Sequence, residues 1–390
     1  MSEPRVRLDR VSFRDFRNLE KLDLELPDAG LAIIGENGQG KTNLLEGIYY
    51  MQVLRSVRGA RDHDLVRFGA RAFHIAGRVE SDSMHELTAA FETAGKRKKV
   101  TRDGAVAARL SDAFGSLPSV IFSPRDIELV AGAPSERRRY LDLVLALSSR
   151  RYLAALQHYR AALARRNAAL RNVARRGGDE AAIAVWEPSL AENGATLVCE
   201  RSRWASENAE RFSRLATAIG EAGHATMSYT RVPRDAEADP RPGAEKENTR
   251  SLCEDDVRGT LEAALARQRK HDLKRGVTHS GPHRDDLDLA LAGRDLRVFG
   301  SAGQQRTAAI ALRMLEGATL RAAEGAEPIL LLDDPFAELD ERRSGNILEL
   351  LRSTGLGQTI LVVPRATDIP PGLVDLERRR ITGGRIEAAA

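Results

Sequence analysis

Two apolar runs, far apart in the chain, each lead directly into a cluster of chemically useful residues. Residues 31–34 are apolar and precede a glycine-rich segment, and apolar residues then recur at helical spacing over residues 43–51. This order predicts a buried strand, a tight turn and a helix. Near the other end of the chain, residues 328–332 form an apolar run that ends in Asp333 and Asp334, which is typical of a strand inside a parallel sheet.

The pattern between these runs divides the chain into two parts. Up to about residue 120, short strand-like runs alternate with turns, including a predicted hairpin turn at residues 102–104. Residues 123–274 are mostly helical in pattern, and Pro134 and Pro188 are each expected near the start of a helix. Strand and helix patterns alternate again after that. Because both ends carry parts of one site, we predict an α/β lobe from residues 1–122 and 275–390, interrupted by a helical insertion, 123–274.

The glycine-rich segment fits the pattern of a phosphate-binding loop, G-x-x-x-x-G-K-[ST]. Its glycines let backbone N–H groups turn inward toward phosphate oxygens at the start of a helix. Lys41 would reach the β- and γ-phosphates, and the Thr42 hydroxyl would bind Mg²⁺. A chance glycine-rich turn is the alternative, and the strand and helix that flank the segment disfavour it. The predicted nucleotide-binding residues here are Gly35, Glu36, Asn37, Gly38, Gln39, Gly40, Lys41 and Thr42.

The two acids after the second apolar run supply the carboxylates that a phosphate loop needs for Mg²⁺ binding and for activating water. At the carboxyl edge of a parallel sheet, Asp333 would hold Mg²⁺ directly or through water. Asp334 would orient or deprotonate the attacking water. A strand can also end in two aspartates for reasons of turn formation alone, and the phosphate loop is what favours the catalytic interpretation.

A third segment resembles the signature motif of ABC-type ATPases. Residues 299–307 read Phe-Gly-Ser-Ala-Gly-Gln-Gln-Arg-Thr and precede an apolar stretch with helical spacing. The start of such a helix favours an anion, and the resemblance implies that Ser301, Gly303 and Gln304 contact the γ-phosphate held by a second subunit. Taken alone, this string could simply cap a helix. Residues 337–340 then resemble the D-loop that follows the acidic strand.

Together with other strings, these motifs resemble the RecF family of SMC-like ATPases over almost the whole chain. Pro335 and Ala337 stand where the family more often has Val and Ser, and residues 363–366 replace its Thr-rich run. The strings that carry the resemblance are residues 16–18, 35–46, 55–58, 122–124, 137–139, 278–286, 300–307 and 332–340.

The resemblance implies an ABC/SMC-type ATPase head with a mostly helical second domain and a slow, DNA-stimulated ATPase activity. Lys41, Asp334 and Ser301 would be catalytic, Thr42 and Asp333 would hold Mg²⁺, and ATP would join two subunits into a homodimer. It further implies binding to single-stranded, gapped or junction DNA, with RecR and RecO as partners. The expected role is to assist RecA loading in recombinational repair, replication restart and the SOS response.

Composition is compatible with this interpretation. The 390 residues carry a net charge of +4, and they suffice for two domains. No apolar run approaches the length of a membrane span, so we expect a cytoplasmic protein without a membrane partner. The two cysteines, Cys199 and Cys253, are too few and too isolated for a disulfide framework or a zinc site.

Charge is nevertheless concentrated in one segment. Residues 137–176 contain eleven arginines and a single acid, Asp142. Leucines repeat there every seven residues, at 156, 163 and 170, as do the basic residues 151, 158 and 165, so a helix would separate them onto two faces. We expect this surface to track DNA phosphates through Arg151, Arg165 and Arg166. The alternative is an arginine-rich solvated face.

Two further alternatives concern metal binding and function. His279 and His283 have metal-ligand spacing only on a helix, which Gly281 and Pro282 would break, so we expect a structural hinge instead. The rival functions are the ATPase subunit of a transporter and a structural DNA-binding protein with a vestigial ATP site. The arginine-rich insertion disfavours the first, and an intact set of site residues disfavours the second.

Overall fold

A computed structural model describes residues 6–231, 253–336, 339–353 and 357–388. The chain forms two compact units. The first unit takes Met1–Asp126, Ala218–Gly220 and Ile310–Ala390, and the second takes Ile127–Thr217 and Glu221–Ala309. Residues 275–309, which the sequence assigned to the ATPase lobe, thus belong to the second unit. The assignment of the two units to an ATPase lobe and an insertion remains a proposal.

One sheet of the first unit is antiparallel throughout, with the strand order β2-β1-β4-β5-β6-β7. The predicted hairpin turn is confirmed, since Asp103 and Gly104 both have positive φ, at 51° and 78°, between β6 and β7. The strands are β1 (Arg7–Phe16), β2 (Leu19–Glu25), β4 (Ala72–Glu80), β5 (Met84–Glu92), β6 (Arg97–Arg102) and β7 (Ala105–Val106).

The other sheet of the first unit carries both predicted buried strands. Its order is β15-β14-β3-β13-β12-β8, and all neighbours are parallel except β14 and β15. Every residue of β3, β8, β12 and β13 is buried, which explains why these strands are continuous apolar runs. The strands are β3 (Gly30–Ile34), β8 (Ser119–Phe122), β12 (Ile329–Asp333), β13 (Thr359–Val363), β14 (Glu377–Thr382) and β15 (Arg385–Ala388).

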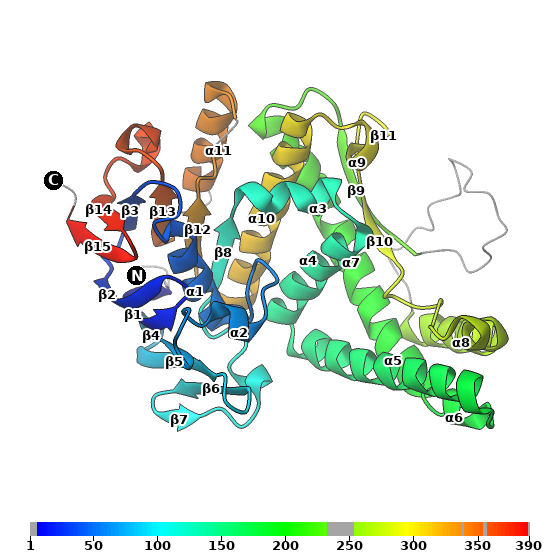
Figure 1. Ribbon diagram of the computed structural model, residues 1–390. Coiled ribbons are helices and arrows are strands. Elements are labelled where there is room, and N and C mark those ends of the chain that lie inside the picture. Colours follow the sequence, from blue (N-terminus) through cyan, green and yellow to red (C-terminus); the bar gives the residue numbers. More distant parts are fainter. Residues whose placement is uncertain (1–5, 232–252, 337–338, 354–356, 389–390) are drawn as a thin grey trace. The chain divides into compact units, whose positions relative to one another are not determined.

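Helix α1 (Lys41–Val53) confirms the helix predicted after the glycine-rich segment. It contacts β8, β12 and β13 of one sheet and β1 and β5 of the other (Figure 1). Being covered on two sides, it is buried almost all round, which is why it lacks a pronounced polar face. The first unit also contains α2 (Asp62–Leu65) and α11 (Glu341–Ser353).

The second unit is mostly helical, as predicted, but it also contains a small antiparallel sheet of order β11-β10-β9. Strand β9 was not expected from the sequence, and its partner β10 lies more than fifty residues further along the chain. The helices are α3 (Glu128–Ala131), α4 (Pro134–Ser148), α5 (Arg150–Arg176), α6 (Ala181–Ala184), α7 (Glu187–Ile219), α8 (Glu254–Arg275) and α9 (Leu296–Phe299). The strands are β9 (Ala225–Thr230), β10 (Asp286–Leu291) and β11 (Arg294–Asp295), and α10 (Ala302–Glu324) crosses the boundary between the units.

The helix starts predicted at the two prolines are confirmed. Pro134 is the first residue of α4, and Pro188 is the second residue of α7. Proline is favoured there because its missing N–H would be unpaired in the first turn anyway. Cys199 is buried and Cys253 is exposed, and neither forms a disulfide within the described part of the chain. Within the described ranges, no helix is long and apolar enough to cross a membrane.

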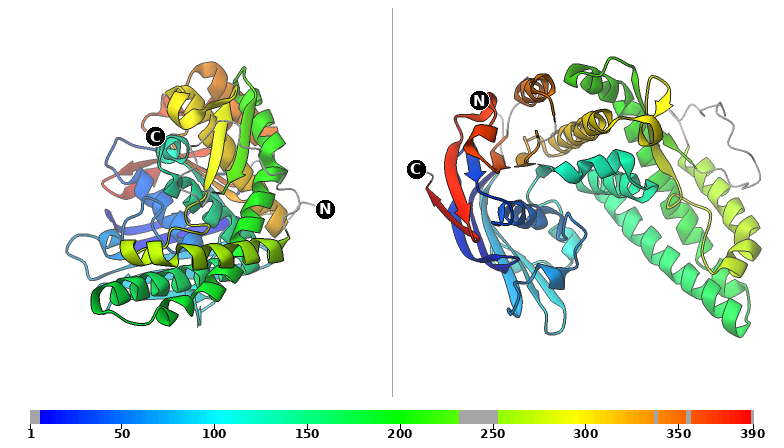
Figure 2. Two further views of the ribbon diagram at one scale, coloured as in Figure 1. Left: turned by 90° about the vertical axis from the view of Figure 1, so that its right-hand side faces the viewer. Right: turned by 45° about the horizontal axis from the view of Figure 1, so that its top comes forward.

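Helix α5 has the two faces that the seven-residue spacing predicted. Leu156 and Leu170 are buried, whereas Arg151 and Arg165 are exposed. Helices α5 and α8 pack side by side within the second unit (Figure 2). Arg166 was expected on the basic surface, and that is wrong, because its side chain is fully buried. It pairs instead with Glu187 at 2.9 Å and with Asp272 at 2.8 Å.

Replacing Arg166 with Ala should strongly destabilise the second unit, since two buried carboxylates would lose their cation. Breaking a buried ion pair costs about 3–5 kcal/mol. Arg165→Ala provides the matched control, because that neighbouring side chain is exposed and lies over the Trp186 ring, 5.1 Å from its centre. Hydrogen exchange of α5 and α8 amides should accelerate greatly in the first variant and little in the second. Equal effects would contradict the pairing.

Candidate nucleotide site

The predicted phosphate loop joins β3 to α1 at the carboxyl edge of the parallel sheet. Gly38 and Gly40 have positive φ angles of 80° and 112°, a conformation that favours glycine. A Cβ added to Gly40 would lie 2.8 Å from the Asn18 side-chain oxygen. The loop therefore needs glycine at residue 40 both for its backbone conformation and for its close contact with the turn after β1.

Lys41 lies over this loop rather than pointing into solvent. Its ammonium group donates hydrogen bonds to the carbonyl oxygens of Gly35, at 2.5 Å, and Glu36, at 2.8 Å. Burial lowers the pKa of Lys41, although the negative charges of Asp333 and Asp334 oppose this shift. The side chain is thus a cation held at the loop and facing two carboxylates.

Thr42 and Asp333, which are far apart in sequence, are in direct contact. The Thr42 hydroxyl donates a hydrogen bond to a carboxylate oxygen of Asp333 at 3.1 Å. Burial is the main reason that the pKa of Asp333 is raised, and the neighbouring Asp334 adds to the effect. A buried carboxylate and a hydroxyl at this spacing are oxygen ligands of the kind that Mg²⁺ prefers. The pair brought together by the structure is the one that the sequence proposed for the metal.

Asp334 follows at the very end of β12, in a backbone conformation that non-glycine residues rarely adopt. Its φ is 46°, and its N–H donates to the Val362 carbonyl oxygen at 3.0 Å. Such a conformation persists only where surrounding structure holds it, and it is frequent at functional sites. Of the predicted D-loop, residues 337–340, the first two lie outside the described part of the chain.

A buried carboxylate beneath the loop was missed by sequence reasoning. Glu46 of α1 is fully buried and pairs with Arg17 at 3.0 Å and Arg58 at 2.7 Å. Burial by itself would raise the pKa of Glu46, but hydrogen bonds from Arg58, Arg17 and Ser56 bring it below the ordinary value. Three separate strings of the sequence thus converge on one acid. The available signal was an acid on the apolar face of a predicted helix.

The turn between β14 and β15 supports the loop from another direction. The Gly383 N–H donates to the side-chain oxygen of Gln39 at 2.7 Å. The Gly384 N–H donates to the backbone carbonyl oxygen of Gln39 at 2.9 Å. The Gln39 side chain is therefore engaged by this turn. An open cavity of about 800 Å³ lies beside it. Its lining includes Arg17, Asn18, Lys21, Phe68, Gly383 and Arg385.

The predicted signature segment, residues 299–307, belongs to the second unit. Ser301 and Gln304 form a reciprocal cap at the beginning of α10, because the Gln304 N–H donates to the Ser301 hydroxyl at 3.3 Å and the Ser301 N–H donates to the Gln304 side chain at 2.9 Å. The helix-cap interpretation of this string is thus confirmed. It does not exclude a contact with phosphate, since Ser301 is exposed.

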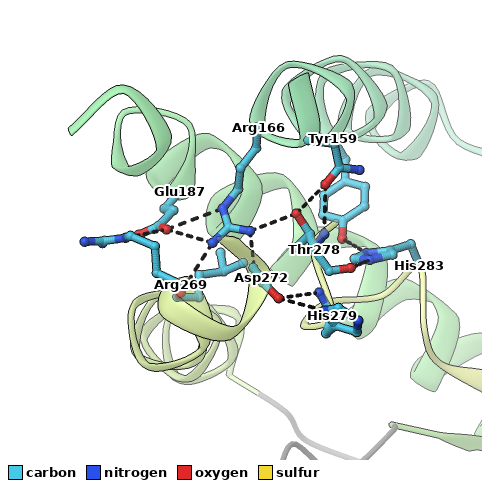
Figure 3. Close-up of polar contacts among 10 residues, drawn as sticks. Tyr159, Arg166, Glu187, Arg269, Asp272, Thr278, His279 and His283 are labelled. Carbon is cyan, nitrogen blue, oxygen red and sulfur yellow. Dashed lines mark hydrogen bonds and ion pairs between the residues drawn. The ribbon is translucent and has the colours of Figure 1, made fainter. Parts of the chain in front are cut away.

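The loop of residues 278–286 is held by buried hydrogen bonds of the second unit (Figure 3). His283 contacts the Tyr159 hydroxyl at 2.6 Å and the Thr278 carbonyl oxygen at 2.9 Å. Burial lowers the pKa of His283 to about 4, so its ring is neutral at physiological pH. His279 instead faces Asp272. The two histidines therefore have separate partners.

The arginine-rich segment is only partly a free cationic surface. Arg137 is buried against Asp286, Arg151 pairs with Glu200 and Glu254, and Arg160 pairs with Asp142. Exposed cations gather toward the other end of α5. The end of α8 adds further cations, which the sequence did not suggest. It lies next to α5, because a Cβ on Gly276, just after α8, would lie 3.1 Å from the Arg171 side chain. The exposed cations at these two helix ends are Arg171, Arg175, Arg176, Lys274 and Arg275.

Comparison with known proteins agrees with these motifs. The family model described as the RecF/RecN/SMC N terminal domain matches residues 7–368. A DNA replication and repair protein RecF of Salinibacter ruber is 35% identical over 94% of this chain and 87% of its own. The protein of the same description from Streptomyces avermitilis is 33% identical over 98% of this chain and 100% of its own length. This chain belongs to the RecF family.

Structural comparison supports the RecF assignment. A solved structure described as the recombination mediator protein RecF-ATP in the RecFOR pathway has a TM-score of 0.87 and 28% identity, covering 100% of this chain and 99% of the other. An Smc head domain from Pyrococcus furiosus has a TM-score of 0.54 at 16% identity, a likeness of fold alone. The predicted fold class, an ABC/SMC-type α/β head with a mostly helical second part, is confirmed.

Asp333→Asn should make the nucleotide-free protein at least as stable as the parent at neutral pH, because it removes a buried charge that the fold penalises. The raised pKa means that Asp333 takes up its proton more readily in the folded than in the unfolded chain. The difference in melting temperature should therefore shrink as pH falls through the raised pKa, where Asp333 itself becomes neutral. Thermal melting across pH measures this. A variant that is less stable at neutral pH would contradict it.

Proposed function

We propose that the protein is an ATP-controlled, DNA-binding ATPase that acts in recombinational repair. The observation that carries this proposal is the convergence of Lys41, Thr42 and Asp333 at one edge of the parallel sheet, with Thr42 and Asp333 only 3.1 Å apart. A phosphate loop and an acidic strand end are the two halves of a Mg²⁺–nucleotide site. The similar solved structures are described as RecF with ATP, which favours ATP as the nucleotide.

In this proposal the phosphate loop, residues 35–42, binds the phosphates, and Thr42 and Asp333 hold Mg²⁺. Lys41 neutralises the β- and γ-phosphates, and Asp334 orients the attacking water. The cavity lined by Asn18 and Phe68 adjoins the loop through Gln39 and Gly384, so we place the base and ribose there. Its volume lies in the range of small-molecule sites, about 300–1,000 Å³.

We further propose that ATP joins two subunits into a two-fold dimer. Ser301, Gly303 and Gln304 of each subunit would cover the γ-phosphate held by the other. The exposed N-terminus of α10 supports this, because the start of a helix attracts an anion. Binding and hydrolysis would then close and open a clamp on single-stranded, gapped or junction DNA. RecR and RecO would be partners in assisting RecA loading, replication restart and SOS induction.

The two rival functions make different predictions. A transporter-type ATPase subunit would associate with membranes. Residues 363–366, at the end of β13, read Val-Pro-Arg-Ala where transporters keep a histidine. A DNA-binding protein with a vestigial site would bind DNA without turnover. An ATPase assay with and without DNA separates the second rival from the proposal, and cell fractionation separates the first.

The dimer can be tested by mixing two inactive variants. Ser301→Asp keeps an oxygen that can cap α10 but puts a carboxylate opposite the partner's γ-phosphate. Lys41→Ala removes the phosphate-binding cation of its own loop, and contacts of this kind contribute about 2–4 kcal/mol to the transition state. Each variant alone should lose at least ~100-fold in turnover. Their mixture should regain activity, because a heterodimer contains one intact phosphate loop facing one intact signature.

Ser301→Asn is the control, since it also keeps the cap but adds no charge, and it should retain more activity than Ser301→Asp. The Ser301→Asp monomer should bind ATP normally, since its own phosphate loop is intact. If that variant instead lost ATP binding as a monomer, Ser301 would act within its own subunit and the two-fold clamp would be wrong.

A second test concerns the DNA-contacting surface. Within the described residues, Arg171, Arg175, Lys274 and Arg275 make no ion pair and are exposed. Replacing all four with Gln should weaken duplex binding about equally for all sequences. The slope of log K against log salt should become less steep by ~0.9 for each lost phosphate contact.

The matched control is Arg151→Gln with Arg160→Gln. These two arginines also lie on α5 and are exposed, but carboxylates of Glu254 and Asp142 already neutralise them. The control should leave the salt slope nearly unchanged. A quadruple variant with the parental slope would mean that this surface is an ordinary solvated face.

A further inference from the structure

Three ligand-bearing side chains lie together at the end of α8, and none of them is among the residues assigned to nucleotide. A ring nitrogen of His271, one of His279 and a carboxylate oxygen of Asp272 lie within 4.8 Å of one another. His271 is exposed, His279 is partly buried and Asp272 is fully buried. The cluster combines residues from a helix and from the loop after it, so its members do not have the regular sequence spacing that would predict a metal site.

The orientation of His279 is fixed by Asp272. Its Nδ1 lies 2.8 Å from a carboxylate oxygen, and its backbone N–H donates to the same oxygen at 3.1 Å. A carboxylate only accepts hydrogen bonds, so Nδ1 carries a proton, and in the neutral ring Nε2 has the lone pair that a metal ion needs. This is the arrangement in which a carboxylate orients a metal-binding imidazole and makes its other nitrogen more basic.

Asp272 is itself held rigidly. Its second oxygen accepts a hydrogen bond from the fully buried Arg166 at 2.8 Å, and the same guanidinium donates to the Thr278 hydroxyl at 2.8 Å (Figure 3). Arg166 also pairs with Glu187, which Arg269 contacts in turn. The carboxylate that orients His279 is thus part of a buried, charge-balanced network, and His279 has little freedom to turn away.

His271 is positioned to supply a second imidazole. The ring centres of His271 and His279 are 4.8 Å apart, with an angle of 63° between the ring planes. Two imidazoles bound to one tetrahedral ion, with metal–nitrogen distances of about 2.0–2.1 Å, have ring centres roughly 5 Å apart. The observed separation therefore suits two nitrogens that share an ion.

We propose that His271 and His279 bind a borderline divalent cation of the Zn²⁺ class, with Asp272 orienting His279 and water completing the coordination. Imidazole nitrogens select Zn²⁺, Ni²⁺ or Cu²⁺ over Mg²⁺, which prefers oxygen. The ion would tie the last turn of α8 to the loop of residues 278–286. Its role would be structural. It would add a link to α8 for a loop that the hydrogen bonds of Arg166 and His283 already order.

The proposal can be tested by Zn²⁺ titration of the full-length protein in the presence of excess Mg²⁺, which would occupy the proposed magnesium site at Thr42 and Asp333. All proteins would carry Cys253→Ser, because that exposed thiol could bind zinc by itself. Calorimetry should show one bound ion. Binding should weaken by at least ~10- to 100-fold in both His271→Asn and His279→Asn, because losing a ligand costs no less than losing a residue that only orients one.

His158→Asn is the matched control, because His158 is an exposed histidine of α5 in the same unit. It should leave zinc binding unchanged. Zinc should also slow hydrogen exchange over residues 276–283 in the parent and in this control, but not in His271→Asn. That variant removes only an exposed side chain, so its fold should be preserved. Zinc binding that is unaffected by His271→Asn, or no saturable binding by the parent, would overturn the proposal.

Discussion

The parallel pairing of three strands is the constraint on which the candidate site depends. β13 pairs with β3 on one side and with β12 on the other, so that Val363 lies opposite Ile34 and Val362 opposite Asp333. Because the register is parallel, both neighbours end at the same edge of the sheet. This pairing alone brings the phosphate loop and the acidic strand end together across nearly three hundred residues. The contact between Thr42 and Asp333 is its consequence.

The edge of a sheet positions the backbone, but buried ion pairs hold the segments around it. Glu46 is buried on the helix that starts at the phosphate loop, and it binds one arginine from the turn after β1 and another from the loop after α1. An isolated charge there would be expensive, so the three segments are held together by the need to neutralise it. The same principle orders the second unit, where Arg166 satisfies Glu187 and Asp272.

These buried pairs change how the charge of the chain is interpreted. In sequence, residues 137–176 form one cationic block, yet its arginines have two different roles. Arg137 and Arg166 are internal and balance acids that come from distant segments. The exposed cations that remain lie toward the end of α5 and continue on α8. A phosphate-binding surface is thus smaller than the sequence implies, and it includes residues from a helix that the sequence analysis left aside.

The sequence by itself determined the phosphate loop, the acidic strand and the strand–turn–helix flanks, because each depends on residues adjacent in the chain. It also determined the two faces of α5, since leucine and arginine recur there with helical period. Only the tertiary structure decided which charges are buried: Glu46, Arg166 and Asp272 have partners far away in sequence, and local pattern carries no record of them. Strand β9 was missed for the same reason, because its pairing partner β10 is supplied from a distant segment. Motifs made of adjacent residues can be identified from the sequence, whereas the partners of buried charges and of strand edges are determined by tertiary packing.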